Sequence, residues 1–267
     1  MKQARWFPPL LFAALTTALC FLTLPIVAIF VDTGPGELLA SLDDPAAVDA
    51  LTLSLWTSAL AVGIIVLVGT PAAFLLATRS FRGRDLLITL IELPLVLPPA
   101  VAGIGLLAAL GPNGLFGQAL DDAGIRVVLT TTSVVLALTF VAAPFYLRQA
   151  ESAFSALDRS WLDASRTLGA GEATTFARVA IPAALPGLIA GLALAWGRAL
   201  GEFGATLMFA GSFRGVTQTV PLAIYERFAT DFTAALGLSA VLVAVSGAIL
   251  LTVKLATRAS PARVLPR

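Results

Sequence analysis

Residues 163–182, DASRTLGAGEATTFARVAIP, form a polar stretch between two long apolar segments. Just before it, Ser160-Trp-Leu-Asp163 has the S-x-x-D pattern of a helix start, in which the serine oxygen accepts an early backbone N–H. An acid in the first turn also favours the positive end of a helix. Ala164 and Ser165 then give the helix small side chains on its surface. A short helix with a low-profile face is therefore expected here.

Two glycines and a proline are expected to set the limits of this hairpin. Glycine adopts positive φ without strain, so Gly169 and Gly171 should stop the first helix after Leu168. A second helical run is expected over residues 172–180. It should end before Pro182, because a residue that precedes proline is disfavoured in the α region. The stretch thus predicts a helical hairpin between two membrane spans.

The composition is that of a polytopic membrane protein. Of 267 residues, 58% are hydrophobic and only 12% are charged, and the mean hydropathy is +0.93. Soluble domains carry about twice that share of charge, so a soluble globular enzyme is excluded. A net charge of +1 gives no indication of a nucleic-acid partner.

Metal and nucleotide chemistry are not expected in this chain. There is no histidine and one cysteine, Cys20, whereas a zinc site needs three or four such ligands. Neither Lys2 nor Lys254 follows a G-x-x-x-x-G run, so the phosphate-cradling P-loop is absent. If ATP drives this protein, another chain must hold the ATP.

Six segments are long and apolar enough to cross a bilayer, which takes about 20 residues each. They are residues 7–30, 51–77, 86–110, 127–147, 184–210 and 234–256. The first has too long an apolar run for a signal peptide and lacks an A-x-A site, so we expect a retained span with a bend at Pro25. The prediction is an all-α membrane protein built as a six-helix bundle.

Charged residues indicate the orientation. Residues 31–50 contain acids but no Lys or Arg, whereas residues 79–84 contain three arginines. The positive-inside rule places those arginines, residues 163–182 and both termini in the cytoplasm. The outer loops hold few cations: Arg126, Arg214 and Arg227.

The third span has prolines at positions 94, 98 and 99, which one regular helix cannot contain. A broken helix is tolerated in a membrane only where protein or a water-filled cavity satisfies the freed carbonyls. Pro98 and Pro99 therefore mark either a segment that lines a translocation path or a packing kink. Glu92 is expected near the inner interface, as a solvated acid.

The fifth span carries two G-x-x-x-G patterns, Gly187 with Gly191 and Gly197 with Gly201. Small residues one turn apart let helices approach closely, so we expect contacts between spans or across a dimer axis. Scatter in a chain with 22 glycines is the alternative.

Arg198 and Glu202 are four residues apart, so they should share a helix face and pair. An unpaired charge at mid-membrane costs about 2.5–3.5 kcal/mol, and neither group should face lipid. A structural ion pair is one interpretation. The other is that the Arg198 region, with Thr206, tunes an anion path, and the residues alone do not decide between them.

The 163–182 stretch resembles the EAA loop of ABC importer membrane subunits. The family's Glu-Ala-Ala, glycine and aliphatic-x-aliphatic-proline positions fall on Asp163, Ala164, Ser165, Gly169, Val179, Ile181 and Pro182. The spacing is intact, and Asp and Ser replace one Glu and one Ala. The runs at 93–103, 198–211 and 219–225 are further similar to the molybdate permease group, over about residues 51–255. Sulfate/thiosulfate and tungstate permeases share much of residues 198–204.

This resemblance implies a type I ABC importer permease in the cytoplasmic membrane of a prokaryote. It implies a second copy of the chain, two cytoplasmic ATPase subunits that hold ATP and Mg, and an extracytoplasmic oxyanion-binding protein, with no cofactor on this chain. The implied coupling loop, 148–182, includes Asp163, Ala164, Ser165, Leu168, Gly169, Ile181 and Pro182. The first helix and outer loop would be residues 1–50, the core 51–255, and a basic tail 256–267.

A stand-alone, ion-coupled carrier is the competing class of function. Such carriers usually place ionisable residues in several spans. Here only Arg198 and Glu202 lie deep, and they can neutralise each other. The loop at 163–182 favours the importer.

Overall fold

The computed structural model describes residues 7–34, 36 and 43–259, and every regular element in these residues is helical. The flanking cations Lys2 and Arg5 and residues 260–267 of the basic tail lie outside the described residues. The helices are α1 Phe7–Asp32, α3 Pro45–Thr78, α4 Arg84–Val96, α5 Pro99–Leu110, α6 Gly117–Asp122, α7 Thr131–Ser155, α8 Arg159–Thr167, α9 Glu172–Thr175, the π-helix Phe176–Ala180, α10 Ile181–Leu200, α11 Gly204–Ala210, α12 Val220–Phe228 and α13 Phe232–Ala259.

Five helical stretches in the described part of the chain are long and apolar enough to cross a membrane. A sixth span forms if α4 and α5 are taken together, although they meet at a bend of 116°. The expected six-span, all-helical arrangement is thus confirmed. The predicted fifth span is wrong in its length, because α10 stops at Leu200 and α11 starts as a separate helix at Gly204.

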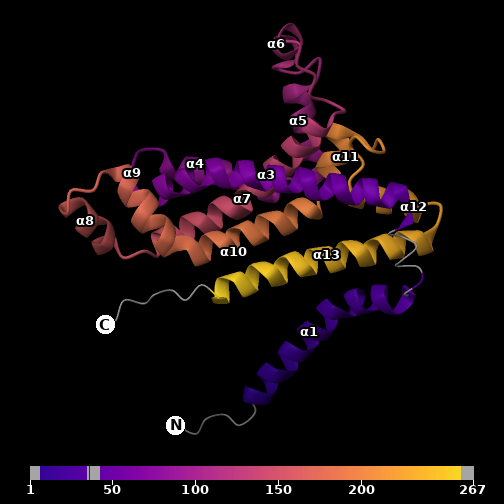
Figure 1. Cartoon of the computed structure of the whole chain (residues 1–267), viewed down its shortest axis with the longest axis horizontal. Coiled ribbons are helices and arrows are strands. Elements are labelled where there is room, and N and C mark those ends of the chain that lie inside the picture. Colours follow the sequence, from indigo (N-terminus) through magenta and orange to yellow (C-terminus); the bar gives the residue numbers. More distant parts are fainter. Residues whose placement is uncertain (1–6, 35, 37–42, 260–267) are drawn as a thin grey trace.

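Helices α3, α7 and α10 pack side by side as the centre of the bundle (Figure 1). Small residues such as Ala61, Ala142 and Ala195 are fully buried there and permit close packing. A Cβ added at Gly69 of α3 would lie 3.0 Å from the Tyr146 ring of α7. One residue on, Thr70 and Tyr146 hydroxyls share a 2.6 Å hydrogen bond, which satisfies both buried groups.

Helix α1 lies at the edge of the molecule, beside α13 (Figure 1). None of its residues, all within the described part of the chain, is buried by the rest of the protein. Pro25 lies within the helix, and α1 changes direction along its length in Figure 1. A helix that is apolar on all sides and uncovered by its own chain requires lipid or another protein around it.

The expected helix break before Pro182 is wrong. Residues 172–200 run on as one helical span, with Ile181 in the right-handed α region at φ −60° and ψ −52°. The π-turn at Phe176–Ala180 explains how the proline is accommodated. There the N–H of Ile181 donates to the carbonyl of Phe176, five residues back, so the widened turn absorbs the change in hydrogen bonding.

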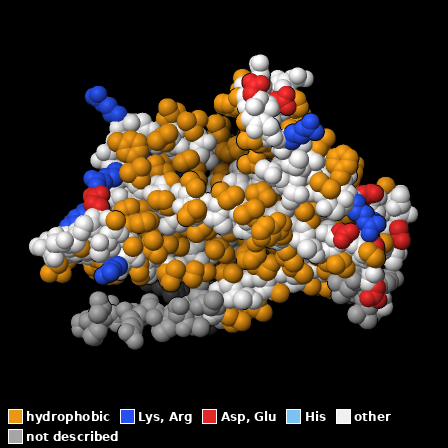
Figure 2. Space-filling model, turned by 45° about the horizontal axis from the view of Figure 1, so that its top comes forward, with side chains coloured by type: hydrophobic (Ala, Val, Ile, Leu, Met, Phe, Trp, Pro, Cys, Tyr) orange, Lys and Arg blue, Asp and Glu red, His pale blue; other side chains and the backbone are white. Residues whose placement is uncertain are grey.

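Charged side chains gather at the two ends of the bundle and are sparse in its middle. Figure 2 shows Lys and Arg side chains at the end formed by α8 and α9, and acids with further cations at the α12 end and near α6. The face between the two ends is largely hydrophobic (Figure 2). Because lipid tails solvate apolar but not charged groups, this band fits the hydrocarbon layer and the charged ends fit the two membrane surfaces.

Candidate functional site

The helix that begins the polar loop, α8, is capped two residues earlier than the sequence predicts. Asp158 is its N-cap, and its carboxylate accepts a 2.9 Å bond from the Ser160 N–H. The expected cap, Ser160, is therefore wrong and lies inside the helix. This hydrogen bond holds the pKa of Asp158 below its ordinary value, since it stabilises the ionised carboxylate.

The end of α8 follows the prediction. Leu168 is the C-cap and Gly169 has φ +86°, in the left-handed region. The Gly169 N–H donates to the Arg166 carbonyl at 2.9 Å, and the Ala170 N–H donates to the Ser165 carbonyl at 3.1 Å. These two bonds form a Schellman motif, which turns the chain sharply after the helix. The direction of α8 is thus fixed by backbone geometry at Gly169.

Side chains tie α8 to the rest of the loop. The Ser165 and Thr175 hydroxyls lie 3.0 Å apart, and Thr175 is almost fully buried. Arg166 lies 3.2 Å from Asp163 and 3.8 Å from Glu172. Glu172 in turn pairs with Arg79, the C-cap of α3. A hydroxyl contact and a line of ion pairs therefore connect α8 to the end of a central helix.

One face of α8 packs on the bundle and the other is free in the isolated chain. Leu162 is 5% exposed and belongs to the main core. Trp161, Ala164 and Leu168 recur at helical spacing and are exposed, Leu168 to 88%. The α8 stripe, meaning Trp161, Ala164 and Leu168, is an apolar surface on a charged end of the protein.

The second part of the site is the break between α4 and α5. Leu97 and Pro98 are both extended, and Pro99 starts α5. Helix α5 then projects from the bundle toward α6, with α11 at its base (Figure 1). A Cβ added at Gly103 would lie 2.7 Å from the Ala205 carbonyl, so the backbones of α5 and α11 touch directly.

Helix α11 is anchored by the ion pair predicted from sequence. Arg198 Nη2 lies 2.5 Å from Glu202 Oε2, and Glu202 is 1% exposed. The two residues do not share a helix face as expected, because α10 ends at Leu200. Glu202 instead lies in the connection to α11, where its Oε1 accepts a 2.7 Å bond from the Ala205 N–H. The carboxylate thus joins the end of α10 to the start of α11.

The structure brings several of the predicted path residues to this junction. A Cβ added at Gly204 would lie 2.8 Å from the Cβ of Pro99, so Glu202 and Pro99 belong to adjoining segments. Thr206 lies in α11 and is fully buried, and its hydroxyl has no hydrogen-bond partner among the described residues. Sequence reasoning missed Gly103 and Gly204 as contact points, although glycines beside the proline run and the Glu-Phe-Gly run were visible signals.

The two glycine pairs of α10 are used differently. A Cβ added at Gly187 would overlap with the Cβ of Ala153 in α7, and one added at Gly191 would lie 3.1 Å from Gln149 of the same helix. At Gly197 an added Cβ would meet no described atom within 4 Å, and at Gly201 only the Gly197 carbonyl. The first pair therefore lies against α7, and the second faces open space.

Opposite α8, a further group of charges joins the start of α3 to α12 and to the loop before α12. Asp44 caps α3 by accepting a 2.9 Å bond from the Ala46 N–H, and it pairs with Arg227. These two contacts hold the pKa of Asp44 below its ordinary value, the Ala46 bond more than Arg227. Arg214 lies 3.5 Å from Asp49 in the same region. A cavity of about 240 Å³ opens between these segments.

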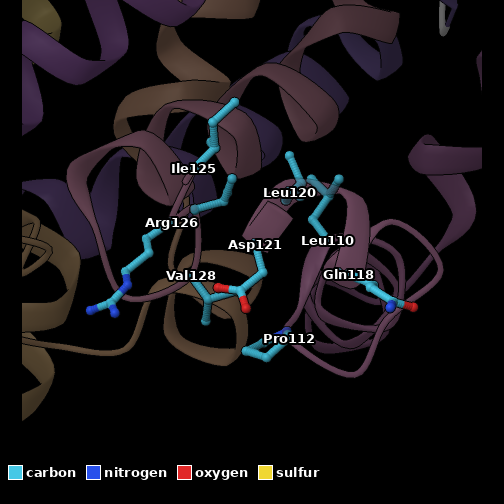
Figure 3. A pocket seen from close by; sticks show the side chains of 10 residues that line it. Leu110, Pro112, Gln118, Leu120, Asp121, Ile125, Arg126 and Val128 are labelled. Carbon is cyan, nitrogen blue, oxygen red and sulfur yellow. The ribbon is translucent and has the colours of Figure 1, made fainter. Parts of the chain in front are cut away.

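One further pocket lies away from the α10–α11 junction. It measures about 480 Å³ and is lined by residues of the 110–128 region alone, mostly apolar ones. Figure 3 shows Arg126 and Gln118 extending away from the grouped apolar side chains on opposite sides. With no α10 or α11 residue in its lining, this pocket is not part of the candidate path.

The fold defines a multi-pass helical membrane protein. Residues 69–265 match the family model of binding-protein-dependent transport system inner membrane components, and the chain belongs to that family. The Molybdenum transport system permease protein ModB of Mycobacterium tuberculosis is 44% identical over 233 residues, 87% of this chain and 88% of that protein. The probable transport system permease protein NifC of Clostridium pasteurianum is 38% identical over 251 residues, covering 93% of this chain and 87% of NifC.

Solved structures confirm the importer fold. A chain of a bacterial ABC transporter involved in the import of the polysaccharide alginate superposes with a TM-score of 0.71, at 16% identity, over 94% of this chain and 96% of that chain. A chain of the MetNI methionine ABC transporter superposes with a TM-score of 0.61, at 18% identity, over 79% and 94%. The type I ABC importer architecture expected from the sequence is therefore confirmed at the level of the fold.

Proposed function

We propose that this chain is the membrane-spanning permease of an ATP-driven importer of an oxyanion, molybdate. The observation that carries the proposal is 44% identity over 87% of the chain to a molybdenum transport permease. Tungstate and sulfate/thiosulfate are the competing substrates, because permeases for those anions share the run at residues 198–204. The chain itself has no nucleotide motif, so ATP and Mg are held by partner subunits.

The α8 stripe is the proposed contact with the ATPase. Its apolar residues are exposed in the isolated chain, and the Schellman turn at Gly169 fixes their direction. A partner cleft that received Trp161, Ala164 and Leu168 would bury them, and burial of apolar area favours association. Two copies of this chain would present two such helices to two ATPase subunits, with Asp163, Ser165, Ile181 and Pro182 shaping the loop behind them.

A second copy of the chain would contact two surfaces. One is formed by Gly197 and Gly201, and the other is helix α5, which projects from the bundle. Gly197 and Gly201 leave space for another helix to approach. On α5, Val101 and Ile104 are 48% and 55% exposed on the side away from the buried Ala102 and Gly103. Both surfaces would be covered in a dimer of this chain.

Transport would follow from coupled movement of these parts. ATP-driven closure of the ATPases would displace α8, and the ion pairs to Glu172 and Arg79 would carry the displacement into α3. The rigid helices would then open the path toward an extracytoplasmic binding protein, which releases its anion. Hydrolysis would reset the path inward.

The path itself would bind the anion only weakly, because tight binding would impede release. Arg198 is engaged by Glu202, which leaves little free positive charge at the α10–α11 junction. Hydroxyl groups such as that of Thr206, with backbone N–H groups near the Pro98–Pro99 break, are the proposed donors. With both termini and α8 in the cytoplasm, the charged end that holds Asp44 and Arg227 would meet the binding protein.

Reconstitution into vesicles tests this function. The chain, the ATPase and the binding protein encoded beside it are combined, and uptake of labelled molybdate, tungstate and sulfate is measured with and without ATP. We expect ATP-dependent molybdate uptake that needs all three proteins. Equal competition by sulfate would change the substrate assignment. Uptake without the ATPase, driven by an ion gradient, would reject the importer.

A further inference from the structure

A second cluster of charges lies between α4 and α7, apart from the polar loop. Arg148 Nε lies 2.8 Å from Glu92, and Arg148 Nη1 lies 3.1 Å from Glu151. Glu151 also accepts a 3.0 Å bond from Arg84. The four charges alternate in sign from Arg84 through Glu151 and Arg148 to Glu92. Glu92, expected to be a solvated acid, keeps 38% of its side chain exposed and is paired with Arg148.

The ion pairs contribute prominently to the contact between α4 and α7. None of the residues of α4, which the structure describes in full, is buried. Apolar side chains along it are largely uncovered, including Leu90 at 50%, Leu93 at 44% and Val96 at 79%. Glu151 of α7, by contrast, is only 14% exposed. Ile88, Ile91 and Pro94 are partly buried, so the ion pairs act together with a modest apolar contact in holding α4.

Glu92 also lies well inside the helix. Eight residues separate it from Arg84 at the start of α4, a distance of about 12 Å along the axis at 1.5 Å per residue. A carboxylate at such a depth is costly without a partner. Breaking the pair would therefore disfavour the position that α4 occupies here.

The cluster lies between the two parts of the candidate site. Helix α7 ends at Ser155, and α8 begins at Arg159. Helix α4 ends at Val96, directly before the break at Leu97 and Pro98. Arg148 thus joins the helix that leads into the polar loop to the half-helix that leads into the break.

We infer that Arg148 is a positioning residue for transport, which through Glu92 makes α4 move together with α7. A displacement that enters at α8 then reaches the Pro98–Pro99 break. Without the pair, α7 moves while α4 stays behind, so ATP is hydrolysed but the path does not open. This inference rests on the permease function proposed above and adds to it the route from the loop to the break.

The test compares Glu92→Gln, Arg148→Gln and the double variant in the complete reconstituted importer. The quantity measured is ATP hydrolysed per molybdate imported. We expect it to rise about tenfold in each single variant, within the range of coupling between protein sites, while binding-protein-stimulated ATP hydrolysis persists. If the two residues act through their pair, the double variant should be no worse than either single variant. Arg148→Lys, which keeps the charge, should recover part of the loss.

Asp85→Asn is the matched control. Asp85 is on the same helix, 98% exposed and 3.6 Å from Arg84, so its loss should leave the ATP-to-molybdate ratio unchanged. An unchanged ratio in Glu92→Gln and Arg148→Gln overturns the inference. So does a parallel fall of melting temperature, ATP hydrolysis and uptake, which indicates a merely structural pair. If wild-type protein imports no oxyanion with ATP, the permease proposal fails first and this inference with it.

Discussion

The guanidinium of Arg198 and the carboxylate of Glu202 lie 2.5 Å apart, although the helix that carries Arg198 ends at Leu200. The pair therefore joins the last turn of α10 to the connection that leads into α11. Glu202 has a second task, because its other oxygen accepts the Ala205 N–H. One buried carboxylate thus satisfies a cation and the first turn of α11.

Two substitutions of Glu202 distinguish its ion pair with Arg198 from its hydrogen bond with the Ala205 N–H. Glu202→Ala leaves Arg198 without its counter-ion and α11 without its cap, and we expect a loss of about 3 kcal/mol, as for other broken buried pairs. Glu202→Gln keeps an oxygen for Ala205 and should lose less. Thermal unfolding of the purified chain in detergent measures both. Equal melting temperatures for the two variants would show that the cap contributes nothing.

Gly169→Val should uncouple the importer without preventing its insertion. The native φ of +86° is strained for any residue with a Cβ, by about 1–2 kcal/mol, and the Schellman turn would shift. Asp163→Lys, which reverses the charge beside Arg166, should act in the same direction. We expect normal membrane levels and at least about a tenfold fall in import per ATP.

Gly171→Ala is the control for that experiment. Gly171 has φ −68° and open space around it, so alanine should be accepted there. Wild-type coupling in both Gly169→Val and Asp163→Lys would reject the role proposed for this loop. Loss of coupling in Gly171→Ala as well would mean that any change in the loop is harmful, whatever the backbone geometry.

Gly187→Ala should destabilise the bundle, since its Cβ would overlap with that of Ala153. Overpacking of this kind costs about 1–3 kcal/mol. Adding Ala153→Gly removes the overlapping atom and should restore the melting temperature. Gly197→Ala, which meets open space within the chain, should leave the melting temperature of the monomer unchanged and lower the fraction of dimer.

Asp44→Asn should lower stability at neutral pH and have a smaller effect in acid. The folded-state pKa of Asp44 is below its ordinary value of 3.8, so ionised Asp44 stabilises the fold above that pH. The contribution is lost as the pH falls through the lower, folded-state value. Asn keeps the cap on Ala46 but loses the charge opposite Arg227.

The expected size is modest, because Asp44 is 36% exposed and solvent screens the pair. We expect less than about 1 kcal/mol, which is a shift of about 2 °C in a chain of this size. Melting curves of wild type and Asp44→Asn at pH 7 and at pH 3 measure the difference. A gap that widens in acid would contradict the assigned sign.

Local backbone geometry was predictable where one residue type decides it. Gly169 ends α8 because only glycine takes its φ without strain, and prolines 98 and 99 break the third span because neither can donate a backbone hydrogen bond. These are properties of single residues. They need no knowledge of what packs nearby.

Competition between local signals was not predictable. Asp158 and Ser160 are both good N-caps, and the structure uses Asp158. Residues 198–204 have no helix breaker other than glycines, so the end of α10 at Leu200 depends on contacts of Glu202 and Gly204 with α11 and α5. The pairing of Glu92 with Arg148 joins positions 56 residues apart and follows only from how α4 lies on α7.

The π-turn at Phe176–Ala180 has a consequence for the angular setting of the loop. One residue of an α-helix turns the chain by about 100°, and a π-turn contains roughly one residue more than an α-turn. Deleting a single residue there would convert the span to regular α-helix and leave α10 seated on α7. The loop beyond would be swung by about a quarter of a circle, so its docking surface would face sideways. The number of residues in this short segment, rather than their side chains, therefore sets the direction in which the docking surface of the loop faces a partner.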